Sequence, residues 1–460
     1  MQNRFPSCWK LTKIVPLHKK GCVLSKQNYR PVAILSPLSK VLEKAIFEQI
    51  YDYFHRNKLF HPALHGYRVN RSTTTALLSM YEKWVCAASE GRLTGVVLVD
   101  LSAAFDLVTP DLLIQKLRIS GLDEDFLVWV QSYLTNRYQT VWIDHVFSDF
   151  LETNIGVPQG SNLGPLLFLI FFNDLPLTVN NEIECYADDS TLSASSDLVA
   201  NVEDKLTSDC GFLSKWMLEN RFKLNPEKTH LLVIGTTNLL RKMPSDLRVF
   251  MDGVQLTKSL CKSELLLGVK IQQNLKWSEH ISYLESKLKV RMAGLEKLKY
   301  VMSKSNRKMI VEGMFKSVLL YGLPLFGGCS KQELKCLQVQ QNRAARLVLR
   351  APPRTSTTLM LEKLSWLSVN QLIALQTLLM VYRIRKSKEP ENLSEYFSQE
   401  SRQGRIMMEN IKQDFYRQSF VYRGSSLWNR LPCKIRCANT CSLFKKQVRE
   451  WIQLNIEAIP

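Results

Sequence analysis

Two short β-rich runs flank an acidic pair, Asp188-Asp189, and this predicted hairpin constrains the fold more than any other feature. Adjacent carboxylates repel each other, so a hairpin tip that carries both is destabilised unless a cation compensates. A further acid, Asp100, falls in the apolar run of residues 95–101, which has the composition of a buried strand. If the two strands are neighbours in one sheet, Asp100 and Asp188 meet at one point.

That arrangement would suit divalent cations. Mg²⁺ binds a few carboxylates and leaves coordination positions for substrate phosphates. Two such ions about 4 Å apart activate a 3′-hydroxyl and stabilise a leaving pyrophosphate. Taken alone, each element also fits a simpler interpretation, with Asp100 as a turn residue at the end of a strand and Asp188-Asp189 as a solvated pair.

Charge is distributed unevenly along the 460 residues, whose total is +19. Residues 1–90 carry a net +9, residues 91–275 carry −8, residues 276–350 carry +10 and residues 351–460 carry +8. Basic segments favour binding to a polyanion, because neutralised phosphates release counterions. The acidic segment between them favours carboxylates that hold cations. Solvated charged faces are the alternative for any one segment, but they explain the alternation of sign poorly.

Length and composition indicate an intracellular globular protein of two to four compact units. Apolar residues make up 45% and charged residues 22% of the chain. The longest strongly apolar run, residues 166–172, is far shorter than the roughly 20 residues of a membrane span. The first residues lack the apolar core of a signal peptide. We therefore expect a location in the nucleus or cytoplasm, without a membrane partner.

Periodicity predicts several further elements. Residues 38–60 and 110–117 are expected to be helical, the second with Pro110 at an early position. Residues 183–195 predict two strands around a turn, and residues 276–390 are mainly helical and basic. Two prolines make residues 351–358 a plausible linker.

Several short motifs occur in the same order as in a known protein family. Residues 100–106, Gly156-Val-Pro-Gln-Gly-Ser161, Tyr186-Ala-Asp-Asp189 and Leu266-Leu-Gly-Val269 resemble the successive palm motifs of reverse transcriptases. Val15-Pro-Leu-His-Lys-Lys-Gly21, Asn28-Tyr-Arg-Pro31 and His65-Gly-Tyr-Arg68 are similar to fingers motifs of non-LTR retrotransposons. Residues 163–174 and 216–229 continue the similarity, and Trp428-Asn-Arg-Leu-Pro432 resembles the C-terminal region of jockey-like elements. Tyr67 stands where the family usually has Phe.

The resemblance implies an α+β right-hand polymerase with fingers, a palm with an antiparallel sheet, a helical thumb and a C-terminal helical extension. We expect the fingers in residues 1–95 and the palm in residues 96–275, with residues 112–150 returning to the fingers. The basic helical thumb is expected in residues 276–350, and a C-terminal helical region in residues 351–460.

The resemblance also implies roles for individual residues. Asp100, Asp188 and Asp189 are the expected catalytic metal ligands, for two Mg²⁺ ions with Mn²⁺ as a possible substitute. Phe105 holds the position of an aromatic gate, whose ring leaves no room for a ribose 2′-hydroxyl. The remaining expected nucleotide-binding residues are Gln159, Gly160, Lys19, Lys20, Arg30 and Lys228. Which of the two fingers lysines contacts the triphosphate stays open. The expected nucleic-acid-binding residues are Lys287, Lys289, Arg291, Lys297 and Lys299.

The function implied is that of an RNA-directed DNA polymerase, which extends a DNA primer with deoxynucleoside triphosphates on an RNA template. We expect this polymerase to lack the endonuclease that jockey-like elements carry N-terminal to it. A catalytically inactive relic of a truncated element, which still binds RNA, is the alternative. A viral RNA-dependent RNA polymerase fits less well, because those enzymes favour Gly-Asp-Asp in the hairpin and lack the aromatic residue at position 105. The oligomeric state stays open.

Overall fold

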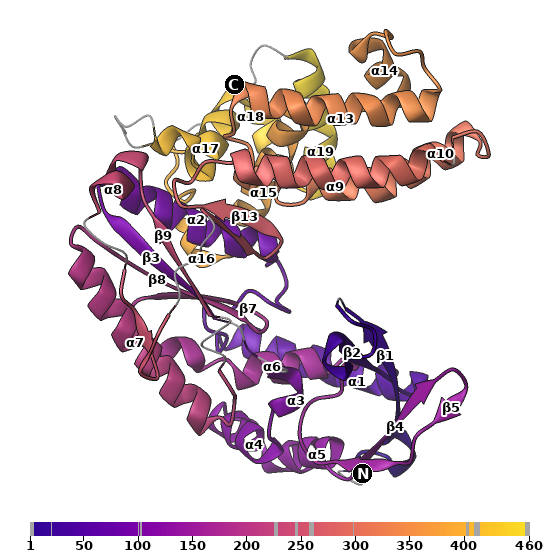
Figure 1. The fold of residues 1–460 in the computed structure, drawn as a ribbon, viewed down its shortest axis with the longest axis vertical. Helices are drawn as coiled ribbons and strands as arrows, with labels where there is room; N and C mark the ends of the chain where they lie inside the picture. The colour runs from indigo at the N-terminus through magenta and orange to yellow at the C-terminus, as the bar shows by residue number, and fades with distance from the viewer. Residues whose placement is uncertain are drawn as a thin grey trace.

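The fold is an arc with a mixed sheet region at one end, an antiparallel sheet in the middle and a helical arm at the other end (Figure 1). It comes from a computed structural model that describes residues 4–19, 21–99, 101, 104–224, 229–243, 247–256, 262–297, 299–401, 404–408 and 415–455. The N-terminus lies in the sheet region at one end and the C-terminus in the helical arm (Figure 1).

A four-stranded antiparallel sheet forms the middle of the arc. Its order is β7 (Glu182–Tyr186), β8 (Asp189–Ser196), β3 (Leu93–Val99) and β9 (His230–Ile234). The two strands that the sequence predicts within residues 183–195 are β7 and β8, and the predicted strand at residues 95–101 is β3. The antiparallel palm sheet of the predicted polymerase fold is thus confirmed.

Both faces of this sheet are covered by helices, which explains the continuous apolar character of β3. Successive side chains of a strand point to opposite faces. Val96 accordingly packs in one core with α2 (Thr73–Ser89), whereas Val97 packs in a second core with α7 (Val199–Glu219). The same α2 also belongs to the core of the helical arm, so it connects the palm to the C-terminal helices.

The sheet at the lower end of the arc contains strands from two distant parts of the chain. Its order is β2 (Tyr29–Ile34), β1 (Leu11–His18), β4 (Arg137–Ile143) and β5 (Val146–Phe147), and β6 (Leu151–Thr153) also pairs with β4. Because β1 and β4 are parallel, the chain must cross over between them. α4 (Pro110–Ile119) and α5 (Glu124–Leu134) precede β4, and α1 (Pro37–Arg56) follows β2. The predicted helices at residues 38–60 and 110–117 are therefore confirmed as α1 and α4.

Helices dominate the chain after residue 278, as predicted. One buried core joins α9 (Ser278–Glu296) and α13 (Lys331–Leu349) to α15 (Val369–Ser387), α17 (Phe420–Arg430) and α19 (Cys441–Leu454). The predicted linker corresponds to a loop between α13 and α14 (Thr357–Leu364), although the first two residues of α14 fall within it. The helices on the two sides of this loop share the same core.

Shorter elements complete the described chain. They are η1 (Ser7–Trp9), η2 (Lys26–Asn28), α3 (Ala104–Leu107), α6 (Gly164–Phe171), η3 (Leu175–Thr178), α8 (Thr237–Lys242), β10 (Phe250–Met251), β11 (Val254–Gln255), β12 (Ser263–Leu266), β13 (Val269–Gln272), α10 (Lys304–Val311), the π-helix η5 (Glu312–Lys316), α11 (Ser317–Leu320), α12 (Leu323–Phe326), α16 (Glu391–Glu395), η6 (Tyr416–Gln418) and α18 (Cys433–Arg436). Among the described residues, no single helix has the length and apolar composition of a bilayer span; α14 and α15, bent by 46°, meet that test only as a pair.

Candidate active site

The strand register brings the end of β3 beside the turn between β7 and β8, at one edge of the palm sheet. Val99, the last residue of β3, pairs with Ser190, and Tyr186 pairs with Asp189 across the turn that contains Asp188. The prediction that the two strands are neighbours is therefore confirmed. Asp100 itself, which follows Val99 in the sequence, lies outside the described residues, as do Lys20 and Lys228.

The turn between β7 and β8 is tight and partly enclosed. Ala187 has a positive φ of 56°, Asp188 is half-buried and Asp189 is exposed. Tyr67, from the loop before α2, lies next to this turn. Burial raises the pKa of the Tyr67 hydroxyl, the Asp188 carboxylate raises it further, and the Arg30 guanidinium on β2 opposes both. Tyr67 is therefore close enough to both Arg30 of the fingers and Asp188 of the palm for their charges to affect the pKa of its hydroxyl.

The loop that carries Tyr67 is fixed directly to the turn by backbone contacts. The His65 N–H donates to the Cys185 carbonyl at 2.8 Å, and the Cys185 N–H donates to the Ala63 carbonyl at 2.9 Å. A Cβ atom on Gly66 would lie 2.6 Å from the Ala187 backbone nitrogen. Only glycine permits this approach, because any side chain would overlap backbone atoms. The fingers motif His65-Gly-Tyr-Arg68 is thus packed on the predicted catalytic turn.

Phe105 is held between two other aromatic rings. Its ring stacks on Phe168 of α6, with centroids 4.2 Å apart and planes 7° apart. The Tyr67 ring meets it edge-on, at 6.1 Å and 83°. Offset stacking and edge-to-face contacts are the preferred geometries for such rings. The half-buried Phe105 ring is therefore fixed in orientation while part of its surface stays accessible.

The loop with Gln159 and Gly160 joins the palm to the fingers sheet. The Val157 N–H donates to the Phe105 carbonyl at 2.9 Å, and the Ala33 N–H of β2 donates to the Gln159 carbonyl at 2.7 Å. Gly160 has a φ of 120°, and a Cβ atom there would lie 2.6 Å from the Ala33 oxygen. This loop therefore holds the segment after β3 at a fixed distance from β2.

Asp106 is a site residue for which the sequence analysis predicted no role. Its Oδ1 accepts a hydrogen bond from Gln159 Nε2 at 2.8 Å. Burial raises the pKa of Asp106, while the Gln159 hydrogen bond and the charge of Lys19 lower it. Lys19 is therefore close enough to act on this carboxyl. Asp106 and Gln159 both line a cavity between the palm loop and the fingers sheet. The position of Asp106 within residues 100–106 was the only available signal.

The five predicted nucleic-acid-binding cations differ in their solvent exposure and in the contacts that their side chains already make. Lys287, Lys289 and Arg291 are exposed on α9, which lies on the side of the helical arm that faces the fingers (Figure 1). Lys287 lies 4.2 Å from the Tyr283 ring centre, Lys289 pairs with Glu285 at 2.9 Å, and Arg291 donates to the Met314 carbonyl at 2.5 Å. Lys297 is exposed and Lys299 is half-buried beside the Tyr300 ring.

No group of three or more His, Cys, Asp and Glu side chains among the described residues is arranged as a metal site. Asp188 and Asp189 supply carboxylate oxygens at the exposed edge of the sheet, and oxygen ligands of this kind suit Mg²⁺. The donor set therefore fits a hard divalent cation, with two of the three predicted ligands among the described residues.

These features define a template-directed polymerase of the right-hand type. The palm carries an acidic hairpin with an aromatic ring beside it, and the fingers sheet is hydrogen-bonded to the palm. A family model described as "Reverse transcriptase (RNA-dependent DNA polymerase)" matches residues 17–288. Because that match covers more than half of the sequence, the chain belongs to the reverse transcriptase family.

Within this family, individual relatives show which group of reverse transcriptases the chain is similar to. The chain is 27% identical over 398 residues to the probable RNA-directed DNA polymerase from transposon BS of Drosophila melanogaster, which covers 83% of this chain and 43% of that protein. It is 25% identical over 363 residues to the RNA-directed DNA polymerase from mobile element jockey of the same species, covering 76% of this chain and 38% of the relative. The predicted similarity to non-LTR retrotransposon polymerases is confirmed. The chain spans less than half the length of these relatives.

Among solved structures, the chain is similar to apo telomerase from Candida tropicalis, with a TM-score of 0.45 and 11% sequence identity, covering 98% of this chain and 68% of the telomerase chain. The same telomerase in complex with a fragment of telomeric RNA gives a TM-score of 0.43 and 12% identity, covering 98% and 65% of the two chains.

Proposed function

We propose that this chain is an active RNA-directed DNA polymerase that extends a DNA primer with deoxynucleotides on an RNA template. In the reaction, the primer 3′-oxygen forms a bond to the α-phosphorus of the incoming triphosphate. The bond between the α- and β-phosphates breaks, pyrophosphate leaves, and the hydroxyl proton is released. The names of the relatives support this activity, and the geometry of the palm supports its location.

The pairing of Val99 with Ser190 is the observation that carries the proposal. It brings the end of β3 to the Asp188-Asp189 turn, which supports a site shared by these carboxylates and by Asp100, the residue that follows Val99 in the sequence. Burial of the alternating β3 side chains on both faces fixes this register, because a shift by one residue would turn each side chain to the wrong face.

Asp100, Asp188 and Asp189 would hold two Mg²⁺ ions. When bound, these ions would favour the ionised primer hydroxyl and neutralise the charge that develops on the leaving pyrophosphate. The half-buried position of Asp188 beside Tyr67 reduces the access of water to that carboxylate. Mn²⁺ is expected to substitute, because it accepts the same oxygen ligands.

Phe105 would form the wall of the site that faces the sugar of the incoming nucleotide. Its stacking on Phe168 and its edge contact with Tyr67 prevent the ring from turning aside for a 2′-hydroxyl. Gln159 and Gly160 would lie under the nascent base pair, where the loop between palm and fingers is rigidly attached.

Cations of the fingers and thumb would bind phosphates. Arg30 is exposed on β2 and Lys19 directly follows β1, so both can reach a triphosphate between fingers and palm. Lys20 and Lys228 remain further candidates for that role. Lys287, Lys289, Arg291, Lys297 and Lys299 would hold the template–primer duplex through its backbone, which is sequence-independent.

Primer extension with the purified chain tests this proposal. The reaction should contain an RNA template, an annealed DNA primer, deoxynucleotides and Mg²⁺. Asp188→Ala and Asp100→Ala should each abolish extension, whereas binding of the template–primer duplex should stay near the wild-type value, because these carboxylates hold metal and not nucleic acid. Asp197→Ala, at an exposed acid just after β8, is the matched control and should remain active.

Two results would contradict the proposal. A wild-type chain that binds the duplex but adds no nucleotide would indicate the inactive RNA-binding relic. Extension by Asp188→Ala within tenfold of the wild-type rate would exclude the metal assignment.

A further inference from the structure

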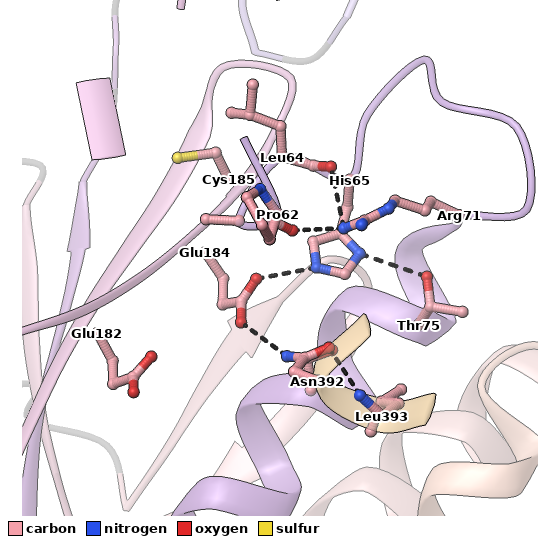
Figure 2. Close-up of polar contacts among 12 residues, drawn as sticks. Pro62, Leu64, His65, Arg71, Thr75, Glu182, Glu184, Cys185, Asn392 and Leu393 are labelled. Atoms are coloured by element: carbon pink, nitrogen blue, oxygen red, sulfur yellow. Dashed lines mark hydrogen bonds and ion pairs between the residues drawn. The ribbon is translucent and has the colours of Figure 1, made fainter. Parts of the chain in front are cut away.

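A buried polar cluster lies behind the catalytic turn, and one of its members comes from the C-terminal helices. His65 Nε2 lies 2.9 Å from Glu184 Oε2, and the two side chains are 0% and 5% exposed. The other oxygen of Glu184 accepts hydrogen bonds from Lys83 Nζ of α2 at 3.2 Å and from Asn392 Nδ2 of α16 at 3.4 Å. Figure 2 shows Glu184 between the His65 ring on one side and Asn392 on the other.

A carboxylate buried to this degree is stable only when it is fully paired. Each of the three donors comes from a different part of the chain: the loop before α2, α2 itself, and α16. Burial lowers the pKa of His65, and the Glu184 hydrogen bond only partly offsets this, so the imidazole is neutral at pH 7. Its Nε2–H therefore donates to the carboxylate. Asn392 is fixed in turn, because its Oδ1 accepts from Ser79 Oγ of α2 at 3.2 Å.

This cluster is connected to the site by short covalent paths. Glu184 lies within β7, four residues before Asp188 in the turn that follows this strand. His65 is followed by Gly66, which packs on the Ala187 backbone, and by Tyr67, which meets the Phe105 ring. A shift of either buried side chain would therefore be transmitted to the metal-binding turn and to the wall of the nucleotide site.

A second set of contacts ties the same loop to the same C-terminal segment. Arg68 and Arg71 have side chains 4% and 0% exposed, and each donates to backbone carbonyls of the loop, Arg68 to His61 and Arg71 to Pro62. Both guanidinium groups also reach Glu389, at 3.9 and 3.7 Å. Arg71 pairs in addition with Glu391 (Figure 2 shows Arg71 at the Pro62 carbonyl). Residues 389–392 are therefore linked to the loop in two ways, directly through Arg68 and Arg71 and indirectly through Glu184 and His65.

We propose that residues 389–392 of the C-terminal helical region are a positioning element of the polymerase centre, acting through Glu184 and His65 on the catalytic turn and on Tyr67. This inference rests on the proposed function. It assigns to the C-terminal helices a part in nucleotide incorporation, in addition to any contact that they make with nucleic acid.

The test uses the full chain and the substitution Asn392→Asp. The new carboxylate has the size of the amide but removes the donor and faces Glu184, so like charges repel in a buried site. We expect kcat/KM for deoxynucleotide incorporation to fall about tenfold, within the range for coupled buried contacts. Affinity for the template–primer duplex should not change. Gln399→Glu adds the same charge at an exposed position after α16 and should leave both quantities unchanged.

A reciprocal variant separates positioning from loss of folding. In Glu184→Gln combined with Asn392→Asp, the amide and the carboxylate are exchanged, so the donor and acceptor are restored. We expect this double variant to recover at least half of the lost activity, whereas each single variant is impaired. Hydrogen exchange measured by mass spectrometry supplies a readout that needs no catalysis: Asn392→Asp should speed exchange in residues 62–68 and 183–189 but not in α7.

Each possible result has a defined consequence. Unchanged kcat/KM and unchanged exchange in Asn392→Asp, in a chain that synthesises DNA, would overturn the positioning role. A parallel loss of duplex affinity would assign the effect to nucleic-acid binding and would also overturn it. A third result is a wild-type chain that makes no DNA, together with faster hydrogen exchange in Asn392→Asp. The proposed function and the positioning role would then both fail, although the structural connection between residues 389–392 and the turn would be supported.

Discussion

Glu82 provides a quantitative test of how α2 binds the C-terminal helices. Its side chain is fully buried, and Oε1 accepts hydrogen bonds from the backbone N–H groups of Phe420 and Val421 at 2.6 and 3.3 Å. Within the described part of the chain, Oε2 has no hydrogen-bond partner. Burial raises the pKa of Glu82 to about 7, although the two N–H donors and the charge of Arg423 act to lower it.

A carboxyl with a raised pKa favours folding most when it is protonated. Its contribution is fully present below the unfolded-state pKa of 4.5 and is lost as the pH rises through about 7. The interval between these two values, at about 1.4 kcal/mol for each pKa unit, corresponds to about 3 kcal/mol. Most of this loss, about 2–3 kcal/mol, falls between pH 5 and pH 8.5.

Glu82→Gln should remove this pH dependence, because the amide keeps a carbonyl oxygen for the Phe420 N–H and does not ionise. We expect the variant to equal the wild type at pH 5 and to exceed it by about 2–3 kcal/mol in unfolding free energy at pH 8.5. Urea denaturation followed by tryptophan fluorescence at the two pH values measures the difference. Glu90→Gln, at an exposed position just after α2, is the control and should follow the wild type.

A variant that is less stable than the wild type at pH 8.5 would refute this reasoning. It would mean that Glu82 is ionised in the folded chain and that its attraction to the half-buried Arg423 outweighs the desolvation of the carboxylate.

Two further predictions concern substrate binding. Phe105→Val should increase the ratio of ribonucleotide to deoxynucleotide incorporation at least tenfold, because a smaller side chain leaves room for the 2′-hydroxyl. Single-nucleotide extension measures this ratio, and an unchanged ratio would mean that Phe105 is only a packing residue. Neutralising Lys287, Lys289 and Arg291 together should weaken binding to all duplexes alike and reduce the slope of log affinity against log salt by about 2–3. Fluorescence anisotropy across a salt series measures this slope. An unchanged slope would mean that α9 does not contact the duplex.

The sequence predicted those parts of the site that depend on local patterns. The continuous apolar run at residues 95–101 identifies β3, and the Asp188-Asp189 pair between two β-rich runs identifies the hairpin, because both signals lie within about ten residues. The order of the motifs then implied which strands are neighbours. The basic character of α9 was equally visible from composition alone.

The features that could not be predicted from the sequence are side-chain contacts, most of them between distant segments of the chain. Glu184 and Asn392 are 208 residues apart, and neither stands out in its own surroundings. Buried glutamates such as Glu82 and Glu184 look like ordinary surface residues in a sequence, because their partners are supplied by other elements. The partial engagement of Lys289 by Glu285 and of Arg291 by Met314 likewise needed side-chain geometry.

The long separation between α2 and its covering helices has a consequence for synthesis on the ribosome. Glu82 and Phe420 are 338 residues apart, so at 5–20 residues per second roughly 20–70 seconds pass between their emergence. Throughout that time the apolar face of α2 and the Glu82 carboxyl lack the cover that α17 later provides. The nascent palm is therefore exposed to aggregation until the last helices are made, and its yield in a heterologous host should depend on chaperones that bind nascent chains.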